Sequence, residues 1–185
     1  MREISLHIMD IAQNSVRAQA SLIVIRLLAD SSRDRLRVEI TDNGTGMSEE
    51  MVAHVTDPFV TSRTTRRVGL GLSLLQAGAE GTGGTFSVTS ELGKGTTVDA
   101  QYVMSHLDRP PIGDFAGTAE SLMVCNPELD FLIEVKLPDQ EEPAALDTRE
   151  IRDLLGADVR LDEPEIASWI RENLHEMFPA AYTDY

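Results

Sequence analysis

Three polar side chains within the first 20 residues stand where they could carry out chemistry together. Asp10, Asn14 and Arg17 are four and three residues apart, which places them along one side of a helix. A carboxylate can accept a proton, an amide oxygen can ligate a hard divalent cation, and a guanidinium can hold phosphate oxygens. A polar row on a helix is more often simply a face exposed to water. These three residues alone leave both interpretations open.

A second candidate segment, Asp42-Asn43-Gly44-Thr45-Gly46-Met47, directly follows a β-like run. An aspartate at the end of a strand can accept a hydrogen bond from an exocyclic amine, and glycines let the backbone approach a ring closely or let a loop swing. The same residues form a common turn sequence. Turn and binding site are therefore equally good interpretations of this segment by itself.

Two more glycine segments follow, each beside a predicted element. Residues 69–72 (Gly-Leu-Gly-Leu) open a predicted helix after the hydroxyl-rich and arginine-rich loop 58–68. Residues 93–96 (Gly-Lys-Gly-Thr) precede a predicted strand, where they could be nothing more than a hairpin turn. The helix N-terminus near residue 71 would favour an anion.

In this order the segments resemble the ATP-binding family shared by bacterial sensor histidine kinases, type II topoisomerases, the ninety-kilodalton heat-shock chaperones and MutL repair proteins. Residues 10–14 resemble its N box, and residues 42–46, 69–71 and 93–96 resemble its first, second and third glycine boxes. Four ordered boxes are far more specific than one glycine motif. The resemblance covers residues 1–104.

Within the family, the histidine-kinase branch is the most similar. Residues 57–62 (DPFVTS) resemble its phenylalanine box, and residues 68–74 (VGLGLSL) resemble the helix start that follows its ATP lid. Residues 14–18 (NSVRA) are also similar to the MutL version of the N box. The assignment to a branch is therefore weaker than the assignment to the family.

The resemblance implies a role for each matching residue. Asn14 would ligate Mg²⁺ and Arg17 would pair with phosphate oxygens. Asp42 would hold the adenine amine, and the hydroxyl of Thr96 would support it directly or through water.

The glycines would hinge a lid and turn amide groups toward the phosphates. The loop arginines at 63, 66 and 67 would clamp the γ-phosphate. An equally good interpretation is that these charges only keep the loop soluble. The residues implied to bind ATP are Asn14, Arg17, Asp42, Gly44, Gly46, Thr61, Arg63, Gly69, Leu70, Gly71 and Thr96.

Asp10 bears on the type of reaction. In the hydrolysing branches a glutamate four residues before the box asparagine positions the attacking water, and this chain has the shorter aspartate there. Asp10 and Asn14 are the candidate catalytic residues, and an Asp10 that only orients Asn14 or His7 is an equally good interpretation. Three functions follow: a stand-alone kinase that passes phosphate from Mg-ATP to a separate protein, a slow ATPase with Asp10 as base, and a non-catalytic ATP-sensing module that grips a regulatory partner. A dimer and a monomer both stay open.

The amino-acid composition bears on which partners the protein can bind and on where in the cell it is located. Acidic residues number 31 and basic residues 16, a net charge of −15, which argues against nucleic-acid binding. Cys125 is the single cysteine, so an intrachain disulfide is impossible, and no stretch approaches the roughly 20 apolar residues of a membrane span. A cytoplasmic protein is expected.

The elements that must position these residues follow from periodicity and turn residues. Apolar spacing predicts a helix over 4–20, and β-like runs at 21–29 and 35–42 predict an antiparallel pair. Further helices are expected at 48–57, 69–79, 114–125, 148–155 and 164–177, strands at 84–90, 96–103 and 130–137, and a polar linker at 138–147.

The resemblance implies a two-layer α/β (α+β) sandwich of the Bergerat type, in which a mixed sheet carries helices on one face. Residues 1–104 would form the histidine kinase-like ATP-binding domain, and residues 105–185 a small acidic α/β extension of unknown role. In the last helix, Trp169, Leu174 and Phe178 are expected in the core, with partner docking as the alternative.

Overall fold

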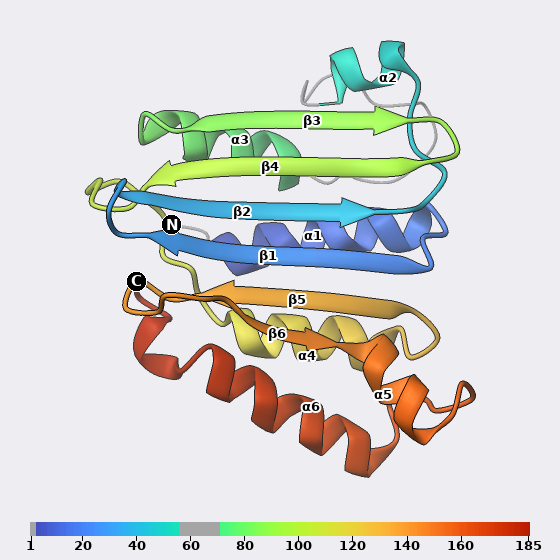
Figure 1. Ribbon diagram of the computed structural model, residues 1–185. Coiled ribbons are helices and arrows are strands. Elements are labelled where there is room, and N and C mark those ends of the chain that lie inside the picture. Colours follow the sequence, from blue (N-terminus) through green and yellow to red (C-terminus); the bar gives the residue numbers. More distant parts are fainter. Residues whose placement is uncertain (1–2, 56–70) are drawn as a thin grey trace.

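The computed structural model describes residues 3–55 and 71–185, and within them the backbone forms a six-stranded mixed sheet (Figure 1). The order across the sheet is β3-β4-β2-β1-β5-β6. Neighbouring strands are antiparallel except β1 and β5, which are parallel. The strands are β1 (Leu22–Asp30), β2 (Arg35–Asp42), β3 (Thr85–Glu91), β4 (Gly95–Val103), β5 (Asp130–Lys136) and β6 (Ala144–Asp147).

Helices α1, α3 and α4 lie side by side against one face of this sheet, which gives the expected two-layer α/β arrangement (Figure 1). Helix α6 packs against α4 and β6, at the β6 side of the sheet. Among the helices described, none combines the length and apolarity needed to cross a membrane. The helices are α1 (Ile4–Arg17), α2 (Glu49–His54), α3 (Gly71–Gly81), α4 (Phe115–Cys125), α5 (Thr148–Leu155) and α6 (Pro164–Met177).

Helix α1 buries the stripe that its spacing predicts. Ile4, Ile8 and Ile11 are buried against the sheet, while Asn14 is exposed. The helix ends three residues earlier than expected because Gln19, at φ 58°, takes the left-handed conformation that stops a helix. The C-terminal part of α1 lies next to the end of β2, where Ser15 contacts Asp42.

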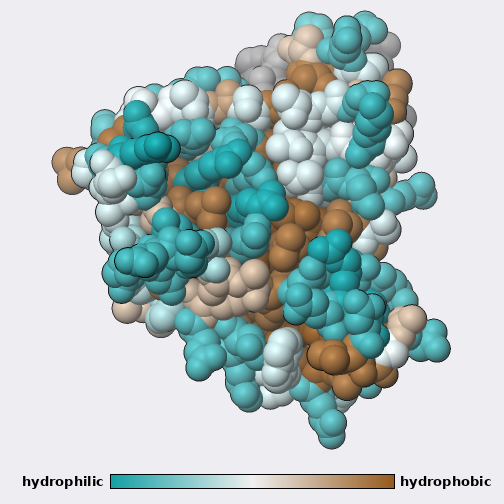
Figure 2. Space-filling model, in the orientation of Figure 1, coloured by the Kyte–Doolittle hydropathy of each residue, from teal (hydrophilic) through white to brown (hydrophobic). Residues whose placement is uncertain are grey.

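The central strands alternate between a buried and a half-exposed face. In β1, Ile23, Ile25 and Leu27 face the helices and are buried. The opposite face carries an ion-pair ladder in which Arg26 contacts Glu39 and Glu134. Figure 2 shows hydrophilic side chains on this open face with hydrophobic patches between them. The fully buried strand residues lie on the helix-covered face, which holds the core.

The C-terminal region continues the same sheet and core. Strand β5 pairs with β1 along its full length, and α4 packs on α1. The buried hydrophobic residues of both regions form one continuous cluster. The division into domains at residue 104 stays a prediction.

Two expectations for the C-terminal region are wrong. The expected linker 138–147 ends in strand β6, whose Leu146 is buried opposite Ile133; four residues at a sheet edge are too short to show an alternating pattern. Leu174 in α6 and Phe178 directly after it are buried as expected, but Trp169 in α6 is 49% exposed. The apolar spacing of α6 predicted a wider buried stripe than the neighbouring elements cover.

Candidate nucleotide-binding site

Asp42 is held rigidly at the C-terminal end of β2, on the helix-covered face of the sheet. Its side chain is buried, with 8% of its surface exposed. The Ser15 hydroxyl donates to Asp42 Oδ2 at 2.6 Å, and the Gly44 amide donates to Asp42 Oδ1 at 2.9 Å. A carboxylate offers about four acceptor positions, so this one can accept a further hydrogen bond.

Strand register places Thr96 beside Asp42. The two residues oppose each other in the antiparallel pair of β2 and β4, so their side chains share one face of the sheet. The Thr96 hydroxyl lies 2.9 Å from the Ser90 hydroxyl, which donates its single proton to the Gly95 carbonyl at 2.8 Å. Thr96 is therefore the donor to Ser90, and its oxygen keeps a free acceptor position.

The first glycine box is shaped by close backbone approach. A Cβ on Gly44 would lie 2.7 Å from the carbonyl oxygen of Ala18, at the end of α1. Gly46 has φ +64°, and a Cβ there would overlap the Glu91 carbonyl. These glycines let the chain after β2 pass tightly between the end of α1 and the β3–β4 turn.

Asn14 and Arg17 form a polar pair on the exposed side of α1. Arg17 Nη1 donates to Asn14 Oδ1 at 2.9 Å, and both residues are exposed. The pair is one helical turn in length, as the three-residue spacing predicts. An amide oxygen and a guanidinium are thus presented together beside the buried carboxylate that Ser15 holds.

Asp10 lies against the second glycine box. A Cβ on Gly71, the first described residue of α3, would be 2.8 Å from the Asp10 Cβ and 3.5 Å from its Oδ2. Glycine at position 71 therefore allows α1 and the first turn of α3 to meet closely. The unpaired amide groups of a helix start attract anions, so the Asp10 carboxylate shares this region with any phosphate bound there.

The described residues thus bring together members of all four boxes on one face of the sheet: Asp10, Asn14 and Arg17 from α1, Asp42, Gly44 and Gly46 after β2, Gly71 from α3, and Thr96 from β4. The remaining sequence-predicted residues, Thr61, Arg63, Arg66, Arg67, Gly69 and Leu70, lie outside the described residues.

Two serines that support the site were missed in the sequence. Ser15 lies in the buried stripe of α1, where a hydroxyl signals a buried polar partner. Ser90 accepts from the Met47 amide at 2.8 Å and ties the segment after Gly46 to β3. Nothing local in the sequence marks Ser90, because its partners come from distant segments.

The residues present fit a magnesium nucleotide. Within residues 3–55 and 71–185 there is no cluster of three or more His, Cys, Asp or Glu side chains that could enclose a metal. Mg²⁺ in nucleotide sites usually takes one or two protein ligands and completes its shell with phosphates and water. A single exposed asparagine oxygen next to an arginine suits that pattern.

Comparisons with known proteins find similarity over the N-terminal part of the chain. Residues 2–105 match the model of the "Histidine kinase-, DNA gyrase B-, and HSP90-like ATPase" family. Among curated proteins, the chain is 31% identical over 84 residues to the sensor histidine kinase ZraS of Escherichia coli, covering 45% of this chain and 18% of that protein. It is 30% identical over 91 residues to sporulation kinase D of Bacillus subtilis, covering 49% and 18%.

The Non-motile and phage-resistance protein of Caulobacter vibrioides is 31% identical over 104 residues, covering 54% of this chain and 12% of that protein. The chain thus spans less than a fifth of the length of these curated relatives.

Solved structures support the fold. The ATPase domain of Aquifex aeolicus MutL, complexed with ADP, superposes with a TM-score of 0.51 at 13% identity, covering 95% of this chain and 69% of that one. The N-terminal domain of a DNA repair protein superposes with a TM-score of 0.58 at 16% identity, covering 98% and 58%. The family model spans more than half of the chain, so the chain belongs to the histidine kinase-, DNA gyrase B-, and HSP90-like ATPase family.

Proposed function

We propose that this chain binds Mg-ATP on the helix-covered face of its sheet and transfers the γ-phosphoryl group to a side chain of a separate protein. The observation that carries the proposal is the Asp42 carboxylate, fixed by Ser15 and Gly44 within the same layer as the α1 polar row. A base-holding group and a phosphate-holding group are thereby set on one rigid scaffold. Because the proposed substrate is ATP, we also propose a cytoplasmic location.

Asp42 and Thr96 would recognise the adenine. The carboxylate is a pure acceptor and is already oriented by two donors, so it selects an amine over a carbonyl at the base edge. The Thr96 oxygen has an acceptor position but no proton to donate, because its proton serves Ser90. Both groups therefore favour a donor on the base, which adenine supplies through its exocyclic amine.

Asn14 and Arg17 would hold the metal and the phosphates. Mg²⁺, when bound, neutralises charge on the phosphate oxygens. The Asn14 amide oxygen accepts one hydrogen bond from Arg17 and keeps a second lone pair for the metal. Repulsion between Mg²⁺ and the guanidinium would favour release of Arg17 when the metal binds. The released Arg17 would then pair with a phosphate oxygen, which couples the two events.

Phosphoryl transfer to a protein is supported by the names of the relatives. ZraS is named a sensor histidine kinase and the Bacillus subtilis relative a sporulation kinase. A histidine kinase needs a phosphoacceptor histidine on a dimerising helix bundle. We propose that such an acceptor is supplied by another protein.

Hydrolysis is the second candidate, favoured by the position of Asp10. Its carboxylate lies against the first described turn of α3, where phosphate binding is expected. From there it could orient a water molecule toward the γ-phosphate, although its reach is about one methylene shorter than that of a glutamate.

The test is the fate of label from γ-labelled ATP incubated with Mg²⁺ and the purified full chain. A separately expressed phosphoacceptor bundle of a sensor histidine kinase serves as the acceptor. Label on the acceptor is the expected result, and Asn14→Ala should reduce it by about a hundredfold or more. Gln13→Ala is the matched control, because this neighbouring amide is exposed on the same helix and should leave transfer unchanged.

Other outcomes separate the alternatives. Free phosphate released with turnover, and lost in Asp10→Asn while ATP still binds, would replace the kinase proposal by the hydrolytic one. Label that stays on ATP although ATP binding is measured would contradict both enzymes and leave an ATP-sensing module.

A further inference from the structure

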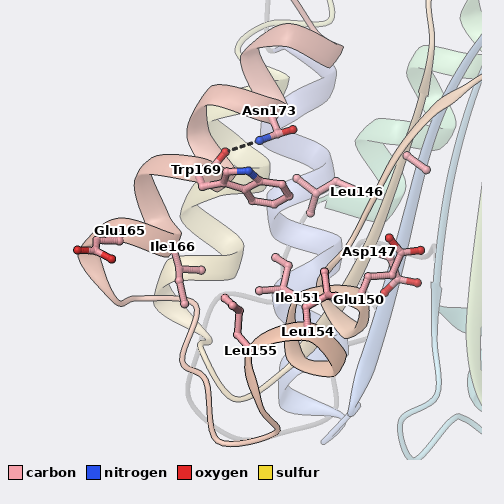
Figure 3. Close-up of a pocket in the computed structure, with 11 residues that line it drawn as sticks. Leu146, Asp147, Glu150, Ile151, Leu154, Leu155, Glu165, Ile166, Trp169 and Asn173 are labelled. Carbon is pink, nitrogen blue, oxygen red and sulfur yellow. Dashed lines mark hydrogen bonds between the residues drawn. The ribbon is translucent and has the colours of Figure 1, made fainter.

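The C-terminal region carries an apolar groove that the nucleotide site does not use. Its volume is about 480 Å³, and it lies between α5, α6 and the edge strand β6 (Figure 3). Side chains of α5 and α6 face one another across it, with β6 beside them. Its apolar lining comprises Leu146, Ile151, Leu154, Leu155, Ile166 and Trp169.

Three of these side chains are exposed to an unusual degree for their size. Leu154 is 84% exposed, Leu155 63% and Trp169 49%. Hydrophobic colour in Figure 2 also gathers over the region of α5. Single exposed apolar residues are ordinary, but several that share one concave site are typical of a surface that another molecule covers.

The rim of the groove is acidic. Asp147, Glu150 and Glu165 line it. Asp147 is paired with Arg149 at 2.5 Å, whereas Glu150 and Glu165 form no salt bridge with any described residue. Two carboxylates at the groove are thus available to a positively charged partner.

The wider surroundings have the same sign. Residues 105–185 hold 19 of the 31 acidic side chains of the chain and only six of its 16 basic ones. Four of those six, Arg149, Arg152, Arg160 and Arg171, are already paired with carboxylates. The net negative charge of the protein is therefore concentrated in the C-terminal region that carries the groove.

We propose that this groove binds a basic amphipathic helix of a partner protein. Apolar side chains on one face of such a helix would contact Leu154, Leu155 and Trp169, and flanking lysines or arginines would meet Glu150 and Glu165. The two walls of the groove are helices, which suits a third helix laid between them.

Charge argues against the other occupants. A second copy of the chain would bring two acidic surfaces together, which disfavours a symmetric dimer through this face. Nucleic acids and anionic membranes carry the same sign as the rim and are repelled.

Trp169 supplies the measurement, because it is the only tryptophan of the chain and lines the groove. The probe is a synthetic helical peptide of about 16 residues, with leucines at i, i+3, i+4 and i+7, lysines on the other face and no aromatic residue. We expect saturable binding by the full chain, without nucleotide, with a blue shift of the Trp169 emission. The same peptide with glutamate in place of lysine should bind at least about tenfold more weakly.

Matched variants locate the binding. Leu154→Ser should lower the affinity for the lysine peptide by about tenfold. Leu107→Ser, at a leucine that is 94% exposed in the turn after β4, should leave the affinity unchanged. Glu150→Lys should weaken binding of the lysine peptide and make that binding less dependent on salt. Asp108→Lys, in the turn after β4, makes an equal change of net charge and should have neither effect. Both exposed leucines can be replaced without disturbing the core.

Several results would overturn the proposal. Absence of binding by the lysine peptide would do so, as would equal binding of the lysine and glutamate peptides or equal loss in Leu154→Ser and Leu107→Ser. Concentration-dependent self-association that is lost in Leu154→Ser would identify a second copy as the occupant instead. Because binding is measured without ATP, none of these outcomes depends on the proposed phosphoryl transfer.

Discussion

The Ser15 hydroxyl lies 2.6 Å from Asp42 Oδ2 and joins helix α1 to the end of strand β2. Both side chains are buried, so the bond acts where water cannot replace it. It connects the helix that carries the N box to the first glycine box, and through the Asp42–Thr96 register to the third. The orientation of the carboxylate that we propose to hold adenine thus depends on a helix residue that would not itself touch the base.

Ser15→Ala should weaken nucleotide binding without unfolding the protein. Removing one of the two donors to a buried carboxylate costs roughly 1–3 kcal/mol of the interaction that orients it. Because ATP binding would depend on that orientation, we expect the Kd for ATP to rise about tenfold. Titration calorimetry with ATP measures the change. Ser5→Ala is the control, since Ser5 is equally buried at the other end of α1 and should leave the Kd unaltered.

Gly46→Ala and Gly93→Ala should differ sharply in stability. Both glycines have positive φ, so both substitutions incur the left-handed penalty of roughly 1–2 kcal/mol. Only at Gly46 would the new Cβ overlap a carbonyl, that of Glu91, whereas Gly93 has open space around it. We expect the free energy of unfolding to fall by at least about 2 kcal/mol more in Gly46→Ala. Equal losses in urea-induced unfolding would show that backbone crowding at Gly46 is unimportant.

Arg17→Ala should alter metal and nucleotide dependence in opposite directions. Because Arg17 donates to the oxygen of Asn14, its removal leaves that oxygen free and should lower the Mg²⁺ concentration needed for half-maximal ATP use. Loss of the phosphate partner should raise the KM for ATP about tenfold. Arg33→Ala removes an equal charge in the β1–β2 turn and should change neither value. Parallel changes in both values would contradict the coupling.

Asp147 should make helix α5 sensitive to acid. Its carboxylate caps α5 by accepting from the Arg149 amide, and hydrogen bonding from the Arg149 side chain lowers the pKa of the carboxyl. A lowered pKa in the folded state stabilises the fold above the ordinary value of about 3.9, and this stabilisation is lost as the pH falls through the folded value.

Asp147→Ala should therefore lower the free energy of unfolding by about 1 kcal/mol near neutral pH, because the cap is lost. The difference from the parent protein should shrink as the pH falls and the parent's carboxyl is protonated. Asp147→Asn keeps an acceptor for the cap and should retain most of the stability while removing the pH dependence. Urea unfolding of the three proteins at several pH values measures this. A cost that does not change toward low pH would contradict a role for the charge.

A protein ending at residue 104 should be less stable than the full chain. Without β5, the buried strand β1 becomes a sheet edge, and without α4 one side of α1 is uncovered. We expect a lower melting temperature and concentration-dependent aggregation by light scattering. A shortened protein that is monomeric and melts at the same temperature would establish residues 1–104 as an independent domain.

The amino-acid sequence by itself determined the family, the order of the boxes and most element positions. Helix α1 and the β1–β2 pair could be predicted because their signals are local: apolar residues at helical spacing, and β-like runs on either side of a turn. The four boxes were recognisable because each combines a polar residue or glycines with an adjacent element. The order in which they follow along the chain needs no knowledge of the fold.

Only the tertiary structure decided how distant residues act on one another. The Ser15–Asp42 bond spans 27 residues, and the reason for glycine at 71 is Asp10 on another helix. Strand β6 is too short to carry a pattern, and it exists because β5 offers it hydrogen bonds. Trp169 has the spacing of a core residue, but whether a stripe is buried depends on how much of it the neighbouring elements cover, and here β6 and α5 leave the indole facing a groove.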